Sequence, residues 1–261
     1  MTALAYAVRR AGPPEILAAI AAAWGLAVIA QHFGATHSVH HGELIEGGLP
    51  LWLALALFLF AWQAMIAAMM LPSSLPFIRL FARASSGQPR SGAAMAAFLG
   101  GYAAVWTWFG AFAFIGDVVI HDVVHRAPWL EQRTWIIAGG VLALAGAFQF
   151  SSLKSACLRE CRNPAAYLLR RYRRGVREAF RIGYGHGLYC LGCCWALMLV
   201  GFAAGVASLP WMAALTLIMV FEKTGKGGDR GARPIGVALF GLAALVLAYP
   251  AAAPILGFEA G

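Results

Sequence analysis

The sequence predicts an all-α membrane protein, a polytopic bundle of about seven transmembrane helices with one additional cytoplasmic amphipathic helix. Composition is the first reason, because 61% of the 261 residues are hydrophobic and only 12% are charged, whereas charged residues make up about 25% of soluble domains. The second reason is that the apolar residues gather in segments long enough to cross a bilayer, which takes about 17 to 25 residues. We therefore expect a single integral membrane domain over residues 1–261.

The first apolar segment, 15–33, follows Arg9 and Arg10 and is expected to be an uncleaved anchor, since no clear small-x-small cleavage site follows it. Cleavage there would leave six spans in the same orientation. The other six predicted spans are 50–71, 93–116, 134–153, 185–206, 209–222 and 234–255. The sixth is short, and so few residues separate it from the fifth that the two should form an antiparallel helical hairpin.

Basic residues orient the predicted bundle. The N-terminus and three alternate connections contain 18 of the 20 Lys and Arg residues. Because basic residues concentrate on the cytoplasmic side, we expect a bacterial inner-membrane protein with its N-terminus in the cytoplasm and its C-terminus in the periplasm. The net charge of +9 then faces anionic lipid, not nucleic acid. Glu222 and Lys223, at the cytoplasmic end of the sixth span, are interpreted as an interfacial ion pair.

Residues 163–182, in the most basic connection, are predicted to form the amphipathic helix. Asn163 and Pro164 have the character of an N-cap and a first helical residue. Apolar residues recur at helical spacing from Ala165 to Phe180, and arginines fill most of the other positions. The lipid surface is the expected partner of this helix, with a docking surface for another protein as the alternative.

All five cysteines lie near the cytoplasmic ends of two consecutive predicted spans. Cys157 and Cys161 follow the fourth span, and Cys190, Cys193 and Cys194 lie one to two turns inside the fifth. Because consecutive spans cross the membrane in opposite directions, we expect the two groups at the same depth. The cytoplasmic side is reducing, so a structural disulfide is not expected there.

One histidine and three methionines extend this group. His186 shares a helical face with Cys190 and Cys194 at i, i+4 and i+8. The methionines approach the cytoplasmic end of the second span: Met65, Met69 and Met70. Thiolates and thioethers favour Cu(I), so the sequence predicts a copper site, with zinc as the alternative metal. A methionine taken singly also fits simple core packing.

Harder ligands collect at the opposite surface. The first outer loop contains three histidines: His37, His40 and His41. If the third span continues beyond the membrane, Asp117, His121 and His125 share one helical face. Two imidazoles and a carboxylate can hold Cu(II), Zn(II) or Fe(II) with open positions, which predicts a second, outer site. The alternative is that these are solvated loop residues without a ligand.

Three segments also carry a resemblance to a known family. They are 62–72 (Trp-Gln-Ala-Met-Ile-Ala-Ala-Met-Met-Leu-Pro), 146–164, which contains Lys-Ser-Ala-Cys-Leu-Arg-Glu-Cys-Arg-Asn-Pro, and 190–198 (Cys-Leu-Gly-Cys-Cys-Trp-Ala-Leu-Met). Over about 50–223 the chain resembles the bacterial predicted metal-binding integral membrane proteins, a family of unknown function with some members described as copper chaperones. The resemblance implies a metal role for the matching residues: Met65, Met69, Met70, Cys157, Cys161, Cys190, Cys193 and Cys194.

Three classes of function fit these observations. The favoured one is a non-enzymatic protein that handles Cu(I) for delivery or for maturation of a partner cuproenzyme. The second is a membrane oxidoreductase that uses the Cys190-x-x-Cys193 pair or the outer Asp117 and histidines. The third is a non-catalytic subunit or assembly factor that holds a structural metal.

Overall fold

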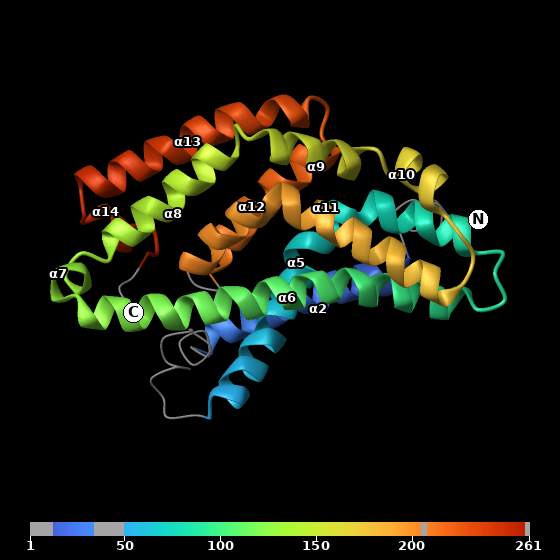
Figure 1. Ribbon diagram of the computed structural model, residues 1–261, viewed down its shortest axis with the longest axis horizontal. Coiled ribbons are helices and arrows are strands. Elements are labelled where there is room, and N and C mark those ends of the chain that lie inside the picture. Colours follow the sequence, from blue (N-terminus) through green and yellow to red (C-terminus); the bar gives the residue numbers. More distant parts are fainter. Residues whose placement is uncertain (1–12, 34–49, 205–207, 259–261) are drawn as a thin grey trace.

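The computed structural model describes residues 13–33, 50–204 and 208–258, and every regular element in these ranges is a helix (Figure 1). The helices are α2 (Pro14–His32), α5 (Leu51–Ser85), α6 (Ser91–Arg126), α7 (Pro128–Glu131), α8 (Trp135–Phe148), α9 (Ser152–Arg162), α10 (Pro164–Arg171), α11 (Val176–Ala203), α12 (Leu209–Thr224), α13 (Gly228–Ala248) and α14 (Ala252–Ile255). The all-α prediction is therefore confirmed for the described part of the chain.

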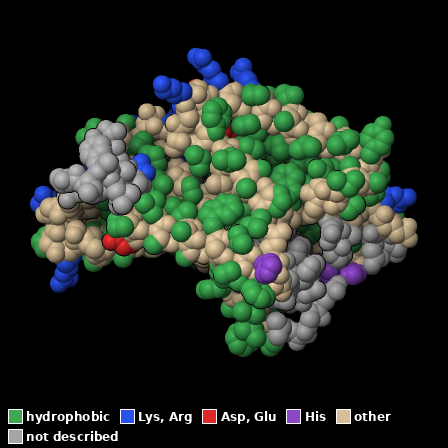
Figure 2. Space-filling view, turned by 180° about the vertical axis from the view of Figure 1, so that it is seen from behind, with side chains coloured by type: hydrophobic (Ala, Val, Ile, Leu, Met, Phe, Trp, Pro, Cys, Tyr) green, Lys and Arg blue, Asp and Glu red, His purple; other side chains and the backbone are tan. Residues whose placement is uncertain are grey.

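Five of these helices are long and apolar enough to cross a membrane: α2, α5, α6, α11 and α13. The pair α8 and α9 meets the same criterion jointly but bends by 65°, so the described residues contain five or six candidate spans. Figure 2 shows hydrophobic side chains spread over one face of the molecule, with Lys and Arg near its edges. These features support a helical membrane protein, and the predicted number of seven spans is not confirmed.

Two predicted spans differ from the observed helices. The segment 134–153 breaks at Gln149–Ser151, where the Ser151 hydroxyl accepts a hydrogen bond from the Lys154 amide and caps a new helix, α9. The predicted sixth span corresponds to α12, which has 16 residues. A helix of that length is shorter than the roughly 20 residues that a span requires.

Helix α5 bends between its two halves (Figure 1). Pro72 and Pro76 lie inside it, and an internal proline removes a backbone hydrogen bond and kinks a helix. The Ser73 hydroxyl donates to the Met70 carbonyl at 2.9 Å. With 35 residues, α5 is far longer than a bilayer requires, and its C-terminal half packs beside α10 and α11.

Helix α11 lies against α6 at very short distance. A Cβ atom on Gly183 of α11 would collide with the Phe98 carbonyl of α6, and one on Gly101 of α6 would collide with the Phe180 carbonyl of α11. Small residues at helix crossings let two backbones approach closely. This contact fixes the rotation of α11 and turns its cysteine face toward α5, α9 and α12.

The predicted single helix over 163–182 is wrong, because the structure has two helices there. Helix α10 ends at Arg171, and Gly175 has φ +117°, a conformation that glycine adopts readily and that ends a helical path. The Tyr172 hydroxyl donates to the Ala84 carbonyl at 2.6 Å, and the Gly175 amide donates to the Gln88 side chain at 3.0 Å. These bonds tie the connection to the C-terminal end of α5.

Candidate functional site

Sulfur atoms from three helices converge in the interior. The thiols of Cys161 (α9) and Cys193 (α11) are 4.0 Å apart, and the Cys194 thiol is 3.8 Å from the Met70 thioether of α5. Cys190 lies one helical turn before Cys193 and Cys194 on α11. All five side chains are buried. We refer to Met70, Cys161, Cys190, Cys193 and Cys194 as the sulfur cluster.

The local sequence explains how α11 presents these thiols. Cys193 and Cys194 follow Cys190 at i+3 and i+4, and both thiols donate to the Cys190 carbonyl, at 3.1 and 2.8 Å. Gly192 lies between Cys190 and Cys193, and a Cβ atom there would be 2.5 Å from the Cys157 sulfur. The missing side chain of Gly192 thus lets α9 approach α11, which brings Cys161 to Cys193.

Two buried lysines contact the cluster. The Lys223 ammonium of α12 donates to the Cys190 sulfur at 3.0 Å and to the Ser73 hydroxyl at 3.1 Å. The Lys154 ammonium of α9 donates to the Cys193 carbonyl at 3.0 Å and pairs with Glu222 at 2.7 Å. Buried charge is costly unless it is paired. Within the described ranges no carboxylate pairs with Lys223, so a Cys190 thiolate would be its natural counter-charge.

The interpretation of Glu222 and Lys223 as an interfacial ion pair is wrong. Glu222 pairs with Lys154, and the three side chains are 6% exposed or less. Lys154 directly follows the predicted span 134–153, in a basic connection, and is nevertheless buried. All three residues lie at the ends of apolar segments, and ionisable residues within such segments usually face the interior of the helix bundle. Their position was therefore the sequence signal for burial.

His186 was predicted to face the metal with the cysteines, but it belongs to an adjacent aromatic layer. Its ring stacks on Phe77 at 4.0 Å and on Tyr102 at 5.6 Å between centroids, and its Nε2 atom is 3.4 Å from the Ser74 hydroxyl. The Tyr102 hydroxyl is 3.0 Å from the Cys190 sulfur. Tyr102 and Ser74, which sequence reasoning missed, therefore connect His186 to the cluster.

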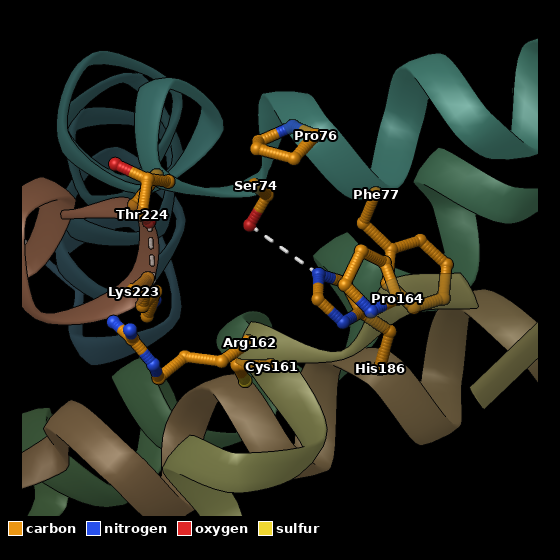
Figure 3. Close-up of a pocket in the computed structure, with 10 residues that line it drawn as sticks. Ser74, Pro76, Phe77, Cys161, Arg162, Pro164, His186, Lys223 and Thr224 are labelled. Carbon is orange, nitrogen blue, oxygen red and sulfur yellow. Dashed lines mark hydrogen bonds between the residues drawn. The ribbon is translucent and has the colours of Figure 1, made fainter. Parts of the chain in front are cut away.

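A cavity of about 210 Å³ lies beside the sulfur cluster. Figure 3 shows Arg162 and Lys223 on one side of it and Phe77 and His186 on the other. Cys161 also lines it. One cysteine of the cluster therefore forms part of the wall of this cavity.

The other predicted inner ligands are buried in the same hydrophobic core as the sulfur cluster. They are Met65 and Met69 of α5, and Cys157, which packs at Gly192. Across 13–33, 50–204 and 208–258, no three side chains of the types His, Cys, Asp or Glu are grouped to hold one ion. The structure thus brings together two sulfur pairs, without a closed set of three or four ligands.

The outer residues fall at the far end of α6, which does continue through Arg126 as the outer-site prediction required. His121 and His125 approach each other with 2.9 Å between their Nε2 atoms, and Asp122 forms an ion pair with Arg126 at 2.9 Å. Asp117 lies one turn earlier on the same helix. The three outer-loop histidines, His37, His40 and His41, lie outside the described residues.

The fold and the site define a helical membrane-type protein with a buried sulfur cluster and two buried lysines at its edge. The family model PpoB2, described as "Copper chaperone", matches residues 59–246, which include the whole cluster and the residues that line the cavity. The chain therefore belongs to this copper-chaperone family, and the resemblance inferred from its motifs is confirmed. No curated protein and no solved structure matches it.

Proposed function

We propose that the protein is a membrane-embedded copper protein that binds Cu(I) through the sulfur cluster and passes it to a partner cuproenzyme. The observation that carries the proposal is the approach of two buried thiols, Cys161 and Cys193, to 4.0 Å from separate helices. The family description supplies the metal.

The sulfur distances are short enough for one metal ion to bridge each pair. A zinc–thiolate bond is about 2.3 Å long, so two sulfurs on opposite sides of an ion with similar bonds lie at most about 4.6 Å apart. The Cys161–Cys193 pair at 4.0 Å and the Cys194–Met70 pair at 3.8 Å both fall inside that limit. Because Cys193 and Cys194 are neighbours on α11, Cu(I) can change partners without leaving a sulfur environment.

Charge balance favours copper over zinc. A Cu(I) ion held by two thiolates leaves one negative charge. The Lys223 ammonium at the Cys190 sulfur can compensate it, whereas the Lys154 ammonium is already paired with Glu222. This compensation matters because charge interactions are strong in a buried, low-dielectric site. A structural zinc site instead has four ligands in a closed tetrahedron.

We place the sulfur cluster near the cytoplasmic side of a bacterial inner membrane, with the N-terminus in the cytoplasm and the C-terminus in the periplasm. The support is the basic composition of the connections around α10 and after α12, since basic residues concentrate on that side. The exposed arginines around α10 would contact anionic lipid. The outer pair His121 and His125 would then face the periplasm as a second ligand site for Cu(II) or Zn(II).

The proposal is tested by anaerobic Cu(I) titration of the full chain in detergent, in competition with a coloured Cu(I) chelator. The Cys161→Ser/Cys193→Ser variant should lose more than the 10- to 100-fold in affinity that loss of a supporting residue costs at metal sites. Met212→Leu is the matched control, because Met212 of α12 is a buried sulfur-containing residue of the same core that lies outside the sulfur cluster. Its copper affinity should stay close to the parent value.

Equal copper affinity in the double variant and the parent would refute this site. Bound zinc in the purified protein would instead support the structural-metal function. Absence of copper, together with a reversible Cys161–Cys193 disulfide, would support the oxidoreductase, and 4.0 Å between those thiols is the observation that keeps this second candidate open.

A further inference from the structure

We propose that copper reaches the sulfur cluster through the cavity as an anionic complex of Cu(I) with small thiolate ligands, not as a free cation. This inference rests on the proposed function and specifies the form in which the site receives its metal. It is carried by the charge, the size and the position of the cavity.

The cavity lining is cationic. Lys223 and Arg162 line it, and among the described residues no Asp or Glu does. The Arg162 guanidinium is held in place by hydrogen bonds to the carbonyls of Glu222 and Gly225. The carboxylate that pairs with Arg162 is that of Asp229, at 3.9 Å. It is 61% exposed, so solvent weakens its effect.

A cationic lining favours the entry of anions over cations. A walled site lined by one sign of charge raises the local concentration of oppositely charged ligands and repels like charges. A free Cu(I) ion is a cation and is repelled, whereas Cu(I) with two thiolates carries at least one negative charge. Carboxylates on the thiols would strengthen the attraction further.

The size limits the carrier to a small molecule. The cavity measures about 210 Å³, while pockets for drug-sized ligands run from about 300 to 1,000 Å³. One water molecule takes about 30 Å³ of the liquid. The cavity can therefore admit a small thiol but not a helix or strand of a partner protein.

The lining also forms a path from the surface to the cluster. Pro76 and Thr224 are exposed, whereas Cys161 and His186 are buried. Cys161 lies between the cavity and Cys193. A complex in the cavity therefore meets Cys161 as the first thiol of the cluster.

Transfer is then a ligand exchange without a redox step. The Cys161 sulfur forms a bond to copper while one carrier sulfur–copper bond breaks, and the Cys161 proton passes to the departing thiolate, which leaves as a neutral thiol group. Copper remains Cu(I). A second exchange at Cys193, 4.0 Å away, releases the second carrier thiol and completes the transfer.

The test compares two copper donors with the same metal–sulfur bonding and opposite charge. Cu(I) with 3-mercaptopropionate is anionic, and Cu(I) with cysteamine is cationic because each ligand carries an ammonium group. The rate of loading into the full-length protein is measured anaerobically at low ionic strength. Each rate is divided by the rate at which the same complex transfers copper to a free chelator, which removes differences in complex stability.

The parent protein should load at least about tenfold faster from the anionic donor, the low end of electrostatic rate effects at charged clefts. This preference should shrink at high salt. Arg162→Gln should reduce it and Arg162→Lys should retain it. Arg133→Gln is the matched control, since Arg133 lies between α7 and α8 and donates to the Trp129 carbonyl. It should leave the preference unchanged.

A second variant pair keeps the test valid if Arg162→Gln folds poorly. Thr224 is exposed, and its hydroxyl donates to the Val220 carbonyl of its own helix. Thr224→Glu therefore places a negative charge at the mouth and should lower the preference. Thr224→Gln is its neutral control. Equal loading from both donors, or a preference unaffected by Thr224→Glu, would overturn this inference while leaving copper binding intact. No loading from either donor would refute the proposed function itself.

Discussion

Lys223 is the residue that separates this site from a simple group of packed thiols. Its ammonium is buried, contacts the Cys190 sulfur at 3.0 Å and has no carboxylate partner among the described residues. A protein core that only needed volume here would be more stable with an apolar side chain, because a buried charge must be desolvated. Under the proposed function, this lysine balances the negative charge that metal binding places on the sulfurs.

Lys223→Met should weaken Cu(I) binding by about 10- to 100-fold, the range typical for loss of a residue that supports metal ligands. The copper-free protein should unfold at the same temperature or higher, since the desolvation cost is gone. Lys223→Arg should recover part of the affinity. Chelator competition and thermal unfolding in detergent measure the two effects, and a purely structural lysine would show lower stability with unchanged affinity.

Lys154→Met is expected to act on stability first. It would leave the Glu222 carboxylate buried, at 2% exposure, without its ammonium partner, and breaking a buried ion pair costs about 3–5 kcal/mol. The double variant Lys154→Met/Glu222→Leu should recover most of that loss, because both charges are removed together. Denaturant unfolding of the two variants gives the comparison, and equal losses would contradict the assigned pair.

At the scale of elements, the crossing of α6 and α11 positions the site. Gly183 and Gly101 allow the two backbones to touch, and this contact sets which face of α11 meets α5, α9 and α12. The periodicity of α11 predicted the shared face of Cys190 and Cys194, but a helix's own periodicity carries no information on the neighbour that covers each face. That is why His186 could be placed on the cysteine face although its ring belongs to an aromatic layer.

Gly183→Ala should destabilise the fold by about 1–3 kcal/mol, as overpacking does, because the added methyl meets the Phe98 backbone and not a movable side chain. Gly100→Ala is the matched control on α6. A Cβ atom at Gly100 meets nothing within 4 Å, and alanine is the better helix former by about 1 kcal/mol. Thermal unfolding should therefore shift in opposite directions, and a similar loss in both variants would contradict the close crossing.

At the scale of the whole molecule, orientation decides which compartment supplies the copper. If the cluster lies near the cytoplasm, its metal arrives from a reducing, thiol-rich solution, which agrees with an anionic thiolate carrier. The prediction rests on the distribution of 18 of the 20 basic residues. The α5–α6 connection would then be cytoplasmic and the α7–α8 connection periplasmic.

Single added cysteines can test this orientation, because all five native cysteines are buried and the parent protein measures any labelling of them. Ser86→Cys, between α5 and α6, should react with a membrane-impermeant maleimide only after the cells are permeabilised. Gln132→Cys, between α7 and α8, should react once the outer membrane is opened. The reverse pattern of labelling would invert the topology and place the sulfur cluster near the periplasm.

The sequence by itself determined the class of this protein and the neighbourhood of its site. Composition and apolar segment length establish helices that suit a membrane, and the motifs around Cys157 and Cys190 establish the family. Cysteines at the ends of consecutive segments were expected at one depth, and Cys161 and Cys193 do meet. Periodicity and chain order are enough for these conclusions, since each is a local property of the chain.

Only the tertiary structure decided the partners. It paired Lys154 with Glu222 across 68 residues, put Lys223 on the Cys190 sulfur, and broke the segment 134–153 at the Ser151 cap. Sequence patterns identify an ionisable residue near the end of an apolar segment but not whether another helix covers it. Burial and charge pairing depend on how α9, α11 and α12 pack together, and that packing sets the chemistry of the site.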